Sequence, residues 1–270
     1  MATSSRKQKR KNKKNDNDDN ENENGGYDLR LAVFDLDYTI WQPEMYQIHG
    51  PPQLRKRTTT FSATDGTGMK QTTTTEVTDR NNVPITIFDG ASYALQYIHK
   101  FNNNNNNNNK KKKKKNRNNY NDDSADVKNY TIKAAIASKT DEPKWAKQCM
   151  DWLTIDIIID DDDDDNNNNN NDDDDDEDHD KKKKKTTRTR RKMTLSECFD
   201  STLIEIGYSN KREHFQRLHK KTNIPYQSMV FFDNEYSNIT SVQKLGVKCI
   251  YTPNGMTKDA WDDALIMFDI

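Results

Sequence analysis

The chain has 270 residues, and only 31% of them are hydrophobic, well below the proportion in an ordinary globular protein. Its formal net charge of -1 comes from blocks of opposite sign that nearly cancel, so charge alone favours neither a nucleic acid nor a membrane as partner. No run approaches the roughly 18 apolar residues of a membrane span, and the first residues lack the apolar centre of a signal peptide, so we expect a soluble intracellular protein.

The shortage of apolar residues is concentrated in three polar tracts. They are a charged N-terminal tail, residues 1–26, and two insertions rich in Asn, Lys and Asp at about 102–128 and 160–192. Such segments bury too little apolar surface to offset chain entropy, so we predict that all three are disordered. The remainder of residues 27–270 is long enough for one well-cored domain.

Two further features of composition concern location and redox state. The basic cluster RKQKRKNKK, Arg6 to Lys14, fits either a nuclear address or a solubilising tail, so we expect a cytoplasmic protein with the nucleus as a second location. The three cysteines, Cys149, Cys198 and Cys249, are far apart and form no CxxC pattern. We expect reduced thiols rather than disulfides or zinc ligands.

The first predicted element is a buried strand. In LAVFDLDYTIW, apolar residues up to Phe34 run directly into turn chemistry, which is typical of a parallel strand. From Gln42 to about residue 84 the sequence is rich in threonine and contains an Asp65-Gly66 turn. Because threonine is β-branched and the turn is of the hairpin kind, this segment predicts a β-flap rather than a helical cap.

Helices and strands alternate after the flap. DGASYALQYIHKF predicts a helix, because its apolar residues recur at helical spacing: Ala91, Ala94, Leu95 and Ile98. YTIKAAIASKT, Tyr130 to Thr140, has strand composition. DEPKWAKQCMDWL is helical, with Pro143 acceptable in a first turn.

The last third of the chain continues the alternation. KREHFQRLHKKTNI predicts a helix that buries Phe215 and Leu218, and SMVFFDNE predicts an apolar strand that ends in acidic residues. VQKLGVKCIYTPNGM predicts a short helix followed by a strand from Val247 to Tyr251. The order of one strand, a flap and four helix–strand units predicts an α/β domain with a parallel sheet.

Three predicted strands end in polar or charged side chains. In parallel sheets, sites form beyond the carboxyl ends of the strands, so these side chains are expected to converge. They are Asp35 and Asp37 after the first strand, Ser138 and Lys139 after the second, and Asp233, Asn234 and Glu235 after SMVFF.

The first pair of carboxylates predicts a metal. Asp35 and Asp37 alternate with Leu36, so they leave the strand end on nearly the same side. Left alone, two such carboxylates repel and one takes up a proton, whereas a divalent cation removes the conflict. Oxygen ligands with no His or Cys nearby favour Mg²⁺, which keeps several waters and takes one or two carboxylates plus a phosphate oxygen.

These residues resemble a known family. DLDYT matches the DxDxT signature of haloacid dehalogenase-like phosphatases, and LAVFDLDYTIW closely resembles the opening of the eukaryotic magnesium-dependent phosphatase 1 family. The likeness continues in AAIASKT, in KREHFQRLHKKTNIPYQSMVFFDNE and in SVQKLGVKCIYTPNGM. It implies a haloacid dehalogenase-like domain over residues 27–270, with a Rossmann-like parallel sheet, helices on both faces and a small β-flap in place of a large cap.

The resemblance also implies a Mg²⁺-dependent phosphomonoester hydrolase. Asp35 would be the nucleophile that forms an aspartyl phosphate. Asp37 would protonate the leaving oxygen and then accept a proton from water. The residues implied to hold the phosphate are Leu36, Ser138, Lys139, which stands where relatives tend to carry Arg, and Lys211. The residues implied to hold the metal are Asp35, Asp37, which would offer its backbone carbonyl, Asp233 and Asn234.

Asn234 is a departure from the family pattern, which has a second acidic residue there. An amide carbonyl is a legitimate oxygen ligand, so we expect weaker Mg²⁺ binding rather than none, with Glu235 adjacent to compensate. A second departure is QPEMY after Trp41, which is less aromatic than its counterpart, so contacts with substrate there are expected to differ.

The family implies activity on protein phosphotyrosine or on a phosphosugar adduct such as fructosamine phosphate. Two alternatives stay open: a serine phosphatase of the polymerase-tail type, which the Asp-Asn pairing also resembles, and a catalytically weak binding protein with a damaged metal site. Read alone, the carboxylates are also compatible with ordinary turn residues. We expect a monomer whose partner is a phosphorylated small molecule or phosphoprotein, with no membrane and no nucleic acid.

Overall fold

The computed structural model describes residues 26–62, 69–115, 130–161 and 187–270. The predicted disorder of the N-terminal tail and of residues 116–128 and 162–186 therefore lies outside the described residues, as does the Asp65-Gly66 turn. Within the part of the chain that is described, no helix is both long and apolar enough to cross a membrane.

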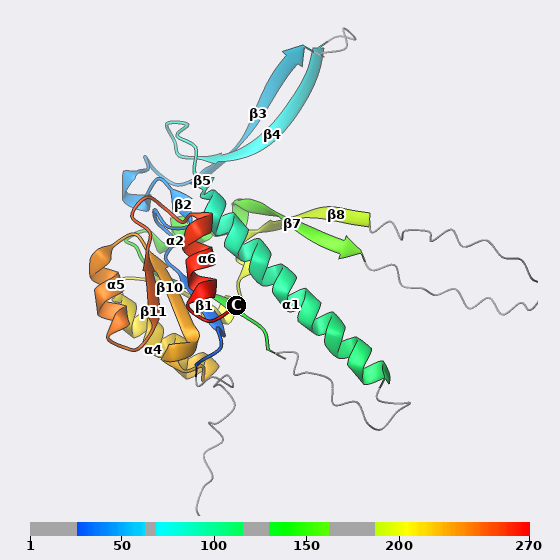
Figure 1. The fold of residues 1–270 in the computed structure, drawn as a ribbon. Coiled ribbons are helices and arrows are strands. Elements are labelled where there is room, and N and C mark those ends of the chain that lie inside the picture. Colours follow the sequence, from blue (N-terminus) through cyan, green and yellow to red (C-terminus); the bar gives the residue numbers. More distant parts are fainter. Residues whose placement is uncertain (1–25, 63–68, 116–129, 162–186) are drawn as a thin grey trace, which may run out of the picture.

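A five-stranded parallel sheet forms the centre of the domain, as the alternating pattern predicted (Figure 1). Its strands in spatial order are β11 (Lys248–Tyr251), β10 (Met229–Asp233), β1 (Leu31–Phe34), β6 (Lys133–Lys139) and β9 (Ile204–Gly207). The first strand lies in the middle, with Phe34 opposite both Ile136 and Phe232. All four residues of β1 are buried, which explains its unbroken apolar sequence.

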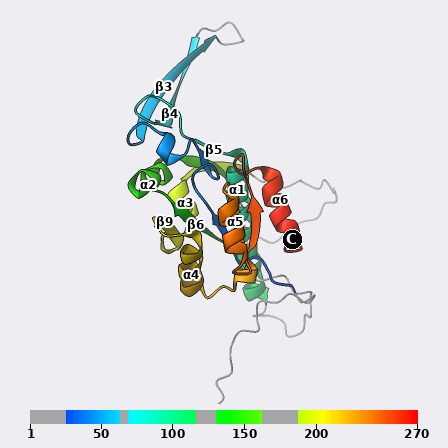
Figure 2. The same ribbon diagram turned by 90° about the vertical axis from the view of Figure 1, so that its left-hand side faces the viewer.

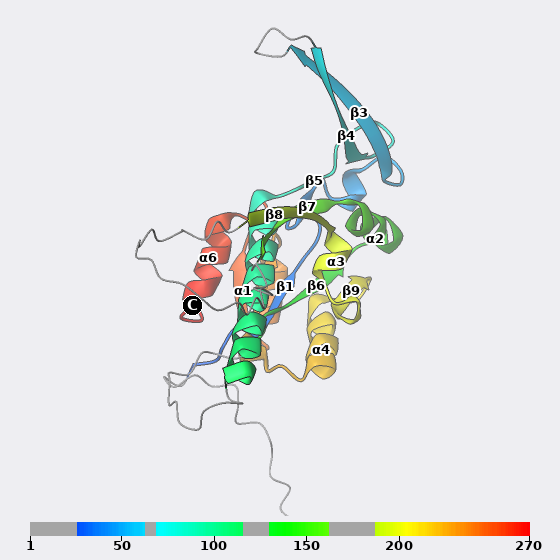
Figure 3. The same ribbon diagram turned by 90° about the vertical axis from the view of Figure 1, so that its right-hand side faces the viewer.

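Helices cover both faces of this sheet, which confirms the predicted layers. Residues of β1 alternate between faces: Ala32 and Phe34 pack in a cluster with α1 (Asp89–Lys115) and α6 (Lys258–Ile266). Leu31 and Val33 pack on the other side with α4 (Lys211–Thr222) and α5 (Tyr236–Gln243). Helix α5 lies in front of the sheet in Figure 2, and α1 lies in front of it in Figure 3. Helix α2 (Pro143–Trp152) and the short α3 (Leu195–Cys198) join the α1 cluster.

The predicted β-flap is a long antiparallel hairpin. Strands β3 (Gln53–Ser62) and β4 (Met69–Thr78) pair along their whole length and project from the body of the domain (Figure 1). Threonines face each other across the ladder, and the hydroxyls of Thr58 and Thr73 lie 3.1 Å apart. A second short pair, β2 (Trp41–Gln42) with β5 (Thr86–Ile87), joins the base of the hairpin to the body.

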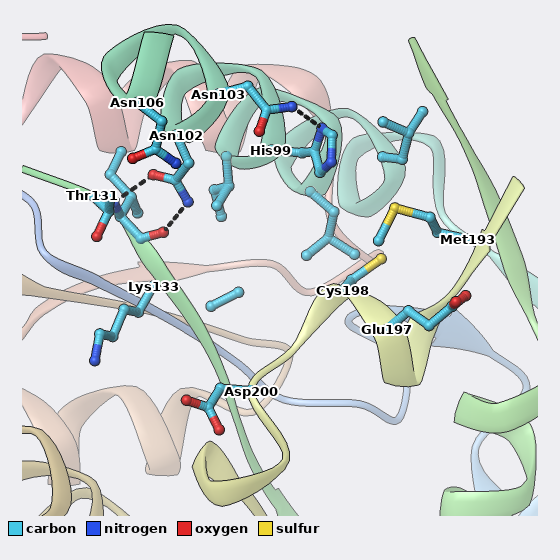
Figure 4. A pocket seen from close by; sticks show the side chains of 15 residues that line it. His99, Asn102, Asn103, Asn106, Thr131, Lys133, Met193, Glu197, Cys198 and Asp200 are labelled. Carbon is cyan, nitrogen blue, oxygen red and sulfur yellow. Dashed lines mark hydrogen bonds between the residues drawn. The ribbon is translucent and has the colours of Figure 1, made fainter. Parts of the chain in front are cut away.

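The prediction of disorder from residue 102 is wrong for the first half of that tract, because α1 continues through it to Lys115. The Asn102 side chain accepts from the Ile132 N–H and donates to the Ile132 carbonyl, both at 2.9 Å (Figure 4). The Asn105 amide donates to the Tyr130 carbonyl at 2.8 Å. These hydrogen bonds join side chains of α1 to backbone groups of the segment just before β6. Composition does not reveal them, because an asparagine run has no apolar periodicity.

The second tract is also shorter than predicted. Strands β7 (Thr154–Asp161) and β8 (Thr187–Thr194) form an antiparallel hairpin, so residues 160–161 and 187–192 are strand rather than disordered. Within β7, the side chains of Ile155 and Ile157 are buried, and Asp156 lies opposite Lys192 of β8. Cross-strand pairs of opposite charge stabilise such a ladder, although neither strand has a strand-like composition from end to end.

Candidate active site

The predicted convergence of strand ends is present as a cleft of about 620 Å³. Asp35 and Asp37 line it from the end of β1, Lys139 from the end of β6, Lys211 from the start of α4 and Asn234 from the loop after β10. Five of the predicted site residues, which are up to two hundred residues apart in sequence, therefore share one cavity.

Lys211 is the cation at the base of the cleft. The Asn210 side chain caps the start of α4 by accepting from the Glu213 N–H at 3.0 Å, which places Lys211 at the first helical position. Its Nζ lies 2.6 Å from Asp35 Oδ1 and 3.0 Å from Asp233 Oδ2, and donates to the Ala137 carbonyl at 2.8 Å. Burial acts to lower the pKa of Lys211, but the two carboxylates outweigh it and the pKa is raised, so the ammonium stays charged.

Asp233 is buried behind that lysine and does not line the cleft. Its Oδ1 accepts from the Glu235 N–H at 2.7 Å, and the Asn238 amide donates to both of its oxygens, at 3.2 and 3.1 Å. Burial, followed by the charge of Asp35, raises the pKa of Asp233 to about 7. Asp233 therefore holds Lys211 in place, and its role as a metal ligand stays a prediction.

Asp37 faces the cleft in a partly buried position. Burial and then the neighbouring Asp35 charge raise the pKa of Asp37 to about 7. Its Oδ1 accepts a hydrogen bond of 2.9 Å from the indole Nε1 of Trp41. A carboxyl group with a pKa near neutrality can both give and take a proton, which is what a general acid and base requires.

The threonine of the DxDxT motif joins the two strand ends. Thr39 is fully buried, and its Oγ1 accepts a hydrogen bond of 3.1 Å from the backbone N–H of Asn234. This bond spans 195 positions of sequence and fixes the β10 loop against the β1 loop. It holds the backbone of Asn234 beside the carboxylates of the first strand.

Two predicted phosphate-binding residues are buried beside the cleft rather than in its wall. Leu36 is completely buried, and its carbonyl accepts from the Ile40 N–H at 2.9 Å. Ser138 is also completely buried, and its Oγ has no hydrogen-bond partner among the described residues. Lys139 does line the cleft and is exposed.

The oxygen donors of the cleft fit a hard cation. No group of three or more His, Cys, Asp or Glu side chains suited to a metal is present within the described ranges. The predicted ligands are instead the Asp35 carboxylate, the Asp37 backbone carbonyl, Asp233 and the Asn234 amide. Asp35, Asp37 and Asn234 line the cavity, whose lining contains no His or Cys. Such an incomplete oxygen shell suits Mg²⁺, which keeps water ligands and needs few protein ones.

The mouth of the cleft is acidic. Its wall includes four further carboxylates and two aromatic side chains: Glu44, Asp141, Glu142, Glu235, Tyr46 and Trp145. Burial and then the charge of Glu235 raise the pKa of Glu44, which shows that these two carboxylates repel each other across the opening. Lys139 is the one cation at the mouth among the lining residues, because the other lysine of the cleft is paired with Asp35 and Asp233.

Sequence reasoning missed two residues that support the site, although signals for them were present. Trp41 follows Asp37 by four positions within the same motif, and Asn238 follows Asp233 by five, at the start of a helix. Neither type is a usual catalytic residue, so only the contacts reveal them.

A second cavity, of about 320 Å³, lies at the opposite end of β6. Its wall includes His99, Lys133 and Cys198, drawn in Figure 4, and none of the predicted site residues.

The fold and the cleft define an α/β domain of the Rossmann-like, haloacid dehalogenase type, with carboxylates and a buried lysine at the carboxyl edge of its sheet. A family model described as Acid Phosphatase matches residues 29–269, and the chain belongs to that family. Magnesium-dependent phosphatase 1 of Homo sapiens is 47% identical over 64 residues, which are 24% of this chain and 36% of the relative. The matched segment thus spans about a third of that protein. The resemblance stated from the sequence is confirmed.

Proposed function

We propose that the protein is a Mg²⁺-dependent phosphomonoester hydrolase that acts through an aspartyl phosphate on Asp35. The observation that carries this proposal is the buried Lys211 ammonium, held between Asp35 and Asp233 at the base of an open cleft. Membership of the acid phosphatase family and the name of the human relative support the reaction class and the metal.

In the first step, Asp35 attacks phosphorus, its new O–P bond forms and the ester O–P bond breaks. Asp37 gives its proton to the departing oxygen. In the second step, water attacks phosphorus and gives a proton to Asp37, the Asp35 O–P bond breaks, and inorganic phosphate leaves, which restores both groups. Lys211 neutralises charge on Asp35 and on the incoming phosphoryl oxygens throughout.

Asp35, Asp37 through its backbone carbonyl, and Asn234 are the residues that would hold Mg²⁺, with Asp233 as the fourth predicted ligand. When bound, Mg²⁺ supplies positive charge for the phosphoryl oxygens. Asn234 contributes a neutral carbonyl where the resemblance calls for a carboxylate, so we expect the protein to need more Mg²⁺ than a version with two charged ligands.

Metal dependence tests this proposal directly. Hydrolysis of an aryl phosphate should fall to background with a chelator and return with added Mg²⁺. Asn234→Asp should lower the Mg²⁺ concentration that gives half of the maximal rate by about 10-fold, because a charged ligand replaces an amide. An absence of turnover at saturating Mg²⁺ would instead support the weak binding protein.

The acidic mouth supports a particular kind of substrate. Glu44, Asp141, Glu142 and Glu235 have no ion-pair partner among the residues that the structure describes, and Trp145 and Tyr46 line the same opening. Unpaired carboxylates and aromatic faces attract cations. We therefore infer that the phosphate is presented next to a positive charge, as in a fructosamine phosphate or a phosphotyrosine flanked by Lys and Arg.

Matched phosphotyrosine peptides, one flanked by lysines and one by glutamates, test this inference. The basic peptide should have a kcat/KM about 10-fold higher at low salt, and the ratio should shrink as salt screens the charges. Glu44→Gln and Glu142→Gln should narrow the ratio, whereas Asp263→Asn on the exposed side of α6 should leave it unchanged. The same peptides with phosphoserine distinguish the polymerase-tail alternative, which would prefer them.

A further inference from the structure

Asp79 is a buried carboxylate at the base of the hairpin formed by β3 and β4. It directly follows β4, and its side chain is completely buried. Its Oδ1 accepts from the Val83 N–H at 2.8 Å. Its Oδ2 accepts from the His49 N–H at 2.9 Å and lies 3.3 Å from the imidazole Nδ1 of the same residue. One side chain thereby joins the segment just before the hairpin to the segment just after it.

Asp79 makes these contacts as a charged group. Burial acts to raise the pKa of Asp79, but hydrogen bonds from the backbone N–H groups of His49, Val83 and Asn81 and from the His49 ring outweigh it, and the pKa is lowered. Hydrogen bonds to an ionised acceptor are about twice as strong as those between neutral groups. The carboxylate is therefore a strong point of attachment for both segments.

The peptide bond that Asp79 holds lies at the end of one wall of the active-site cleft. This wall, called the η1 wall, consists of the 3₁₀-helix η1 (Met45–Gln47) and the residues on each side of it. Its members that line the cleft are Glu44, Met45, Tyr46 and Ile48. The His49 N–H directly follows them, so Asp79 fixes the C-terminal end of the wall. Nearer its N-terminal end, the Met45 N–H donates to the carboxyl group of Asp37.

We propose that Asp79 is a positioning residue that holds the η1 wall against the part of the substrate beyond the phosphate. The inference rests on the proposed function, in which Glu44 and Tyr46 of this wall face the positively charged flank of the substrate. Asp79 does not line the cleft, so it touches neither the phosphate nor the metal. Its loss should therefore weaken the binding of an extended substrate and leave the reaction at phosphorus intact.

Two substrates of different size test this role. In Asp79→Ala, kcat/KM for the phosphotyrosine peptide flanked by lysines should fall by about 10-fold, mainly through a higher KM. For phenyl phosphate, which ends at the aryl ring, kcat/KM should fall by less than about 3-fold. A loss of folded protein lowers both rates equally, so the ratio of the two substrates reports on the wall and not on stability.

Thr78→Val is the matched control. Thr78 is the neighbouring residue and is also buried, but its Oγ1 has no hydrogen-bond partner within the described part of the chain. This variant should leave the substrate ratio unchanged. If Asp79→Ala does not fold, Asp79→Asn keeps the shape of the side chain. Because its amide NH₂ donates and cannot accept, either His49 or Val83 loses its acceptor, so the substrate ratio should change in the same direction by a smaller factor.

Amide hydrogen exchange measures the wall without any substrate. Exchange in residues 44–49 should be about 10-fold faster in Asp79→Ala than in the wild type, because the His49 N–H loses its acceptor, and should not change in Thr78→Val. Absence of turnover in the wild-type protein would count against the proposed function, whatever the exchange shows. With an active wild type, unchanged exchange overturns the positioning role of Asp79, and so does faster exchange without a change in the substrate ratio.

Discussion

Replacement of Asp35 by Asn is expected to lower the rate of phosphate ester hydrolysis by at least about 10³-fold, which is the scale of loss when a covalent hydrolase loses its nucleophile. An amide nitrogen or carbonyl cannot form the acyl phosphate bond that a carboxylate forms. The fold should survive, because Asn has nearly the same shape and Lys211 keeps its contacts with Asp233 and with the Ala137 carbonyl.

Steady-state hydrolysis of an aryl phosphate and mass spectrometry of acid-quenched protein measure the two consequences. The wild-type protein should carry phosphate on the peptide that contains Asp35, and Asp35→Asn should carry none. Asp263→Asn is the control, because it removes an exposed carboxylate of α6 that does not line the cleft. A variant without Asp35 that kept more than about 1% of the rate would exclude this residue as nucleophile.

The sequence predicts the site best where a reactive side chain directly follows a recognisable parallel strand. Asp35 and Asp37 end an unmistakably buried strand, and the rule that parallel strands gather their carboxyl ends was sufficient to bring Lys139 and Asn234 to the same cleft. The resemblance to a family supplied Lys211, whose position at the start of a helix shows no such role by itself. Its 2.6 Å contact with Asp35 explains why the lysine is there.

The sequence predicts less where a residue's surroundings determine its role. The sequence predicts Asp233 only as a metal ligand, and its buried contact with Lys211 is visible only in the structure. The asparagines at 102 and 105 belong to a polar tract, yet each pairs with backbone groups before β6. Composition measures the apolar surface that a segment can bury and does not count hydrogen bonds to a neighbouring strand.

Replacement of Lys211 by Met is expected to destabilise the domain and abolish most of its activity. Methionine keeps an unbranched apolar stem at this buried position but removes the charge between Asp35 and Asp233. Removal of one partner of a buried ion pair costs about 3–5 kcal/mol, because the remaining charge is left uncompensated. The rate should fall by about 10²-fold or more, since the charge that offsets phosphoryl oxygens is lost.

The pH dependence of this loss of stability follows from the Asp233 carboxylate, which no longer has a cation beside it. The pKa of Asp233 is already raised to about 7, and Lys211 acts to lower it, so its removal raises that pKa further. The folded variant then binds more protons than the unfolded chain above the ordinary aspartate pKa, and its stability falls as pH rises. Urea unfolding should therefore show a smaller difference from the wild type at pH 5 than at pH 8.

A double variant separates the contribution of the Lys211 charge to stability from its contribution to catalysis. Lys211→Met combined with Asp233→Asn should recover much of the lost unfolding free energy, because it removes one of the two uncompensated carboxylates. It should not recover the rate, because the Lys211 cation that faces the phosphoryl group is still missing. Lys220→Met, on the exposed side of the same helix, should change neither quantity. Full activity in the double variant would show that Lys211 serves only to neutralise Asp233. A stable single variant would show that the cluster at the base of the cleft is not held by charge.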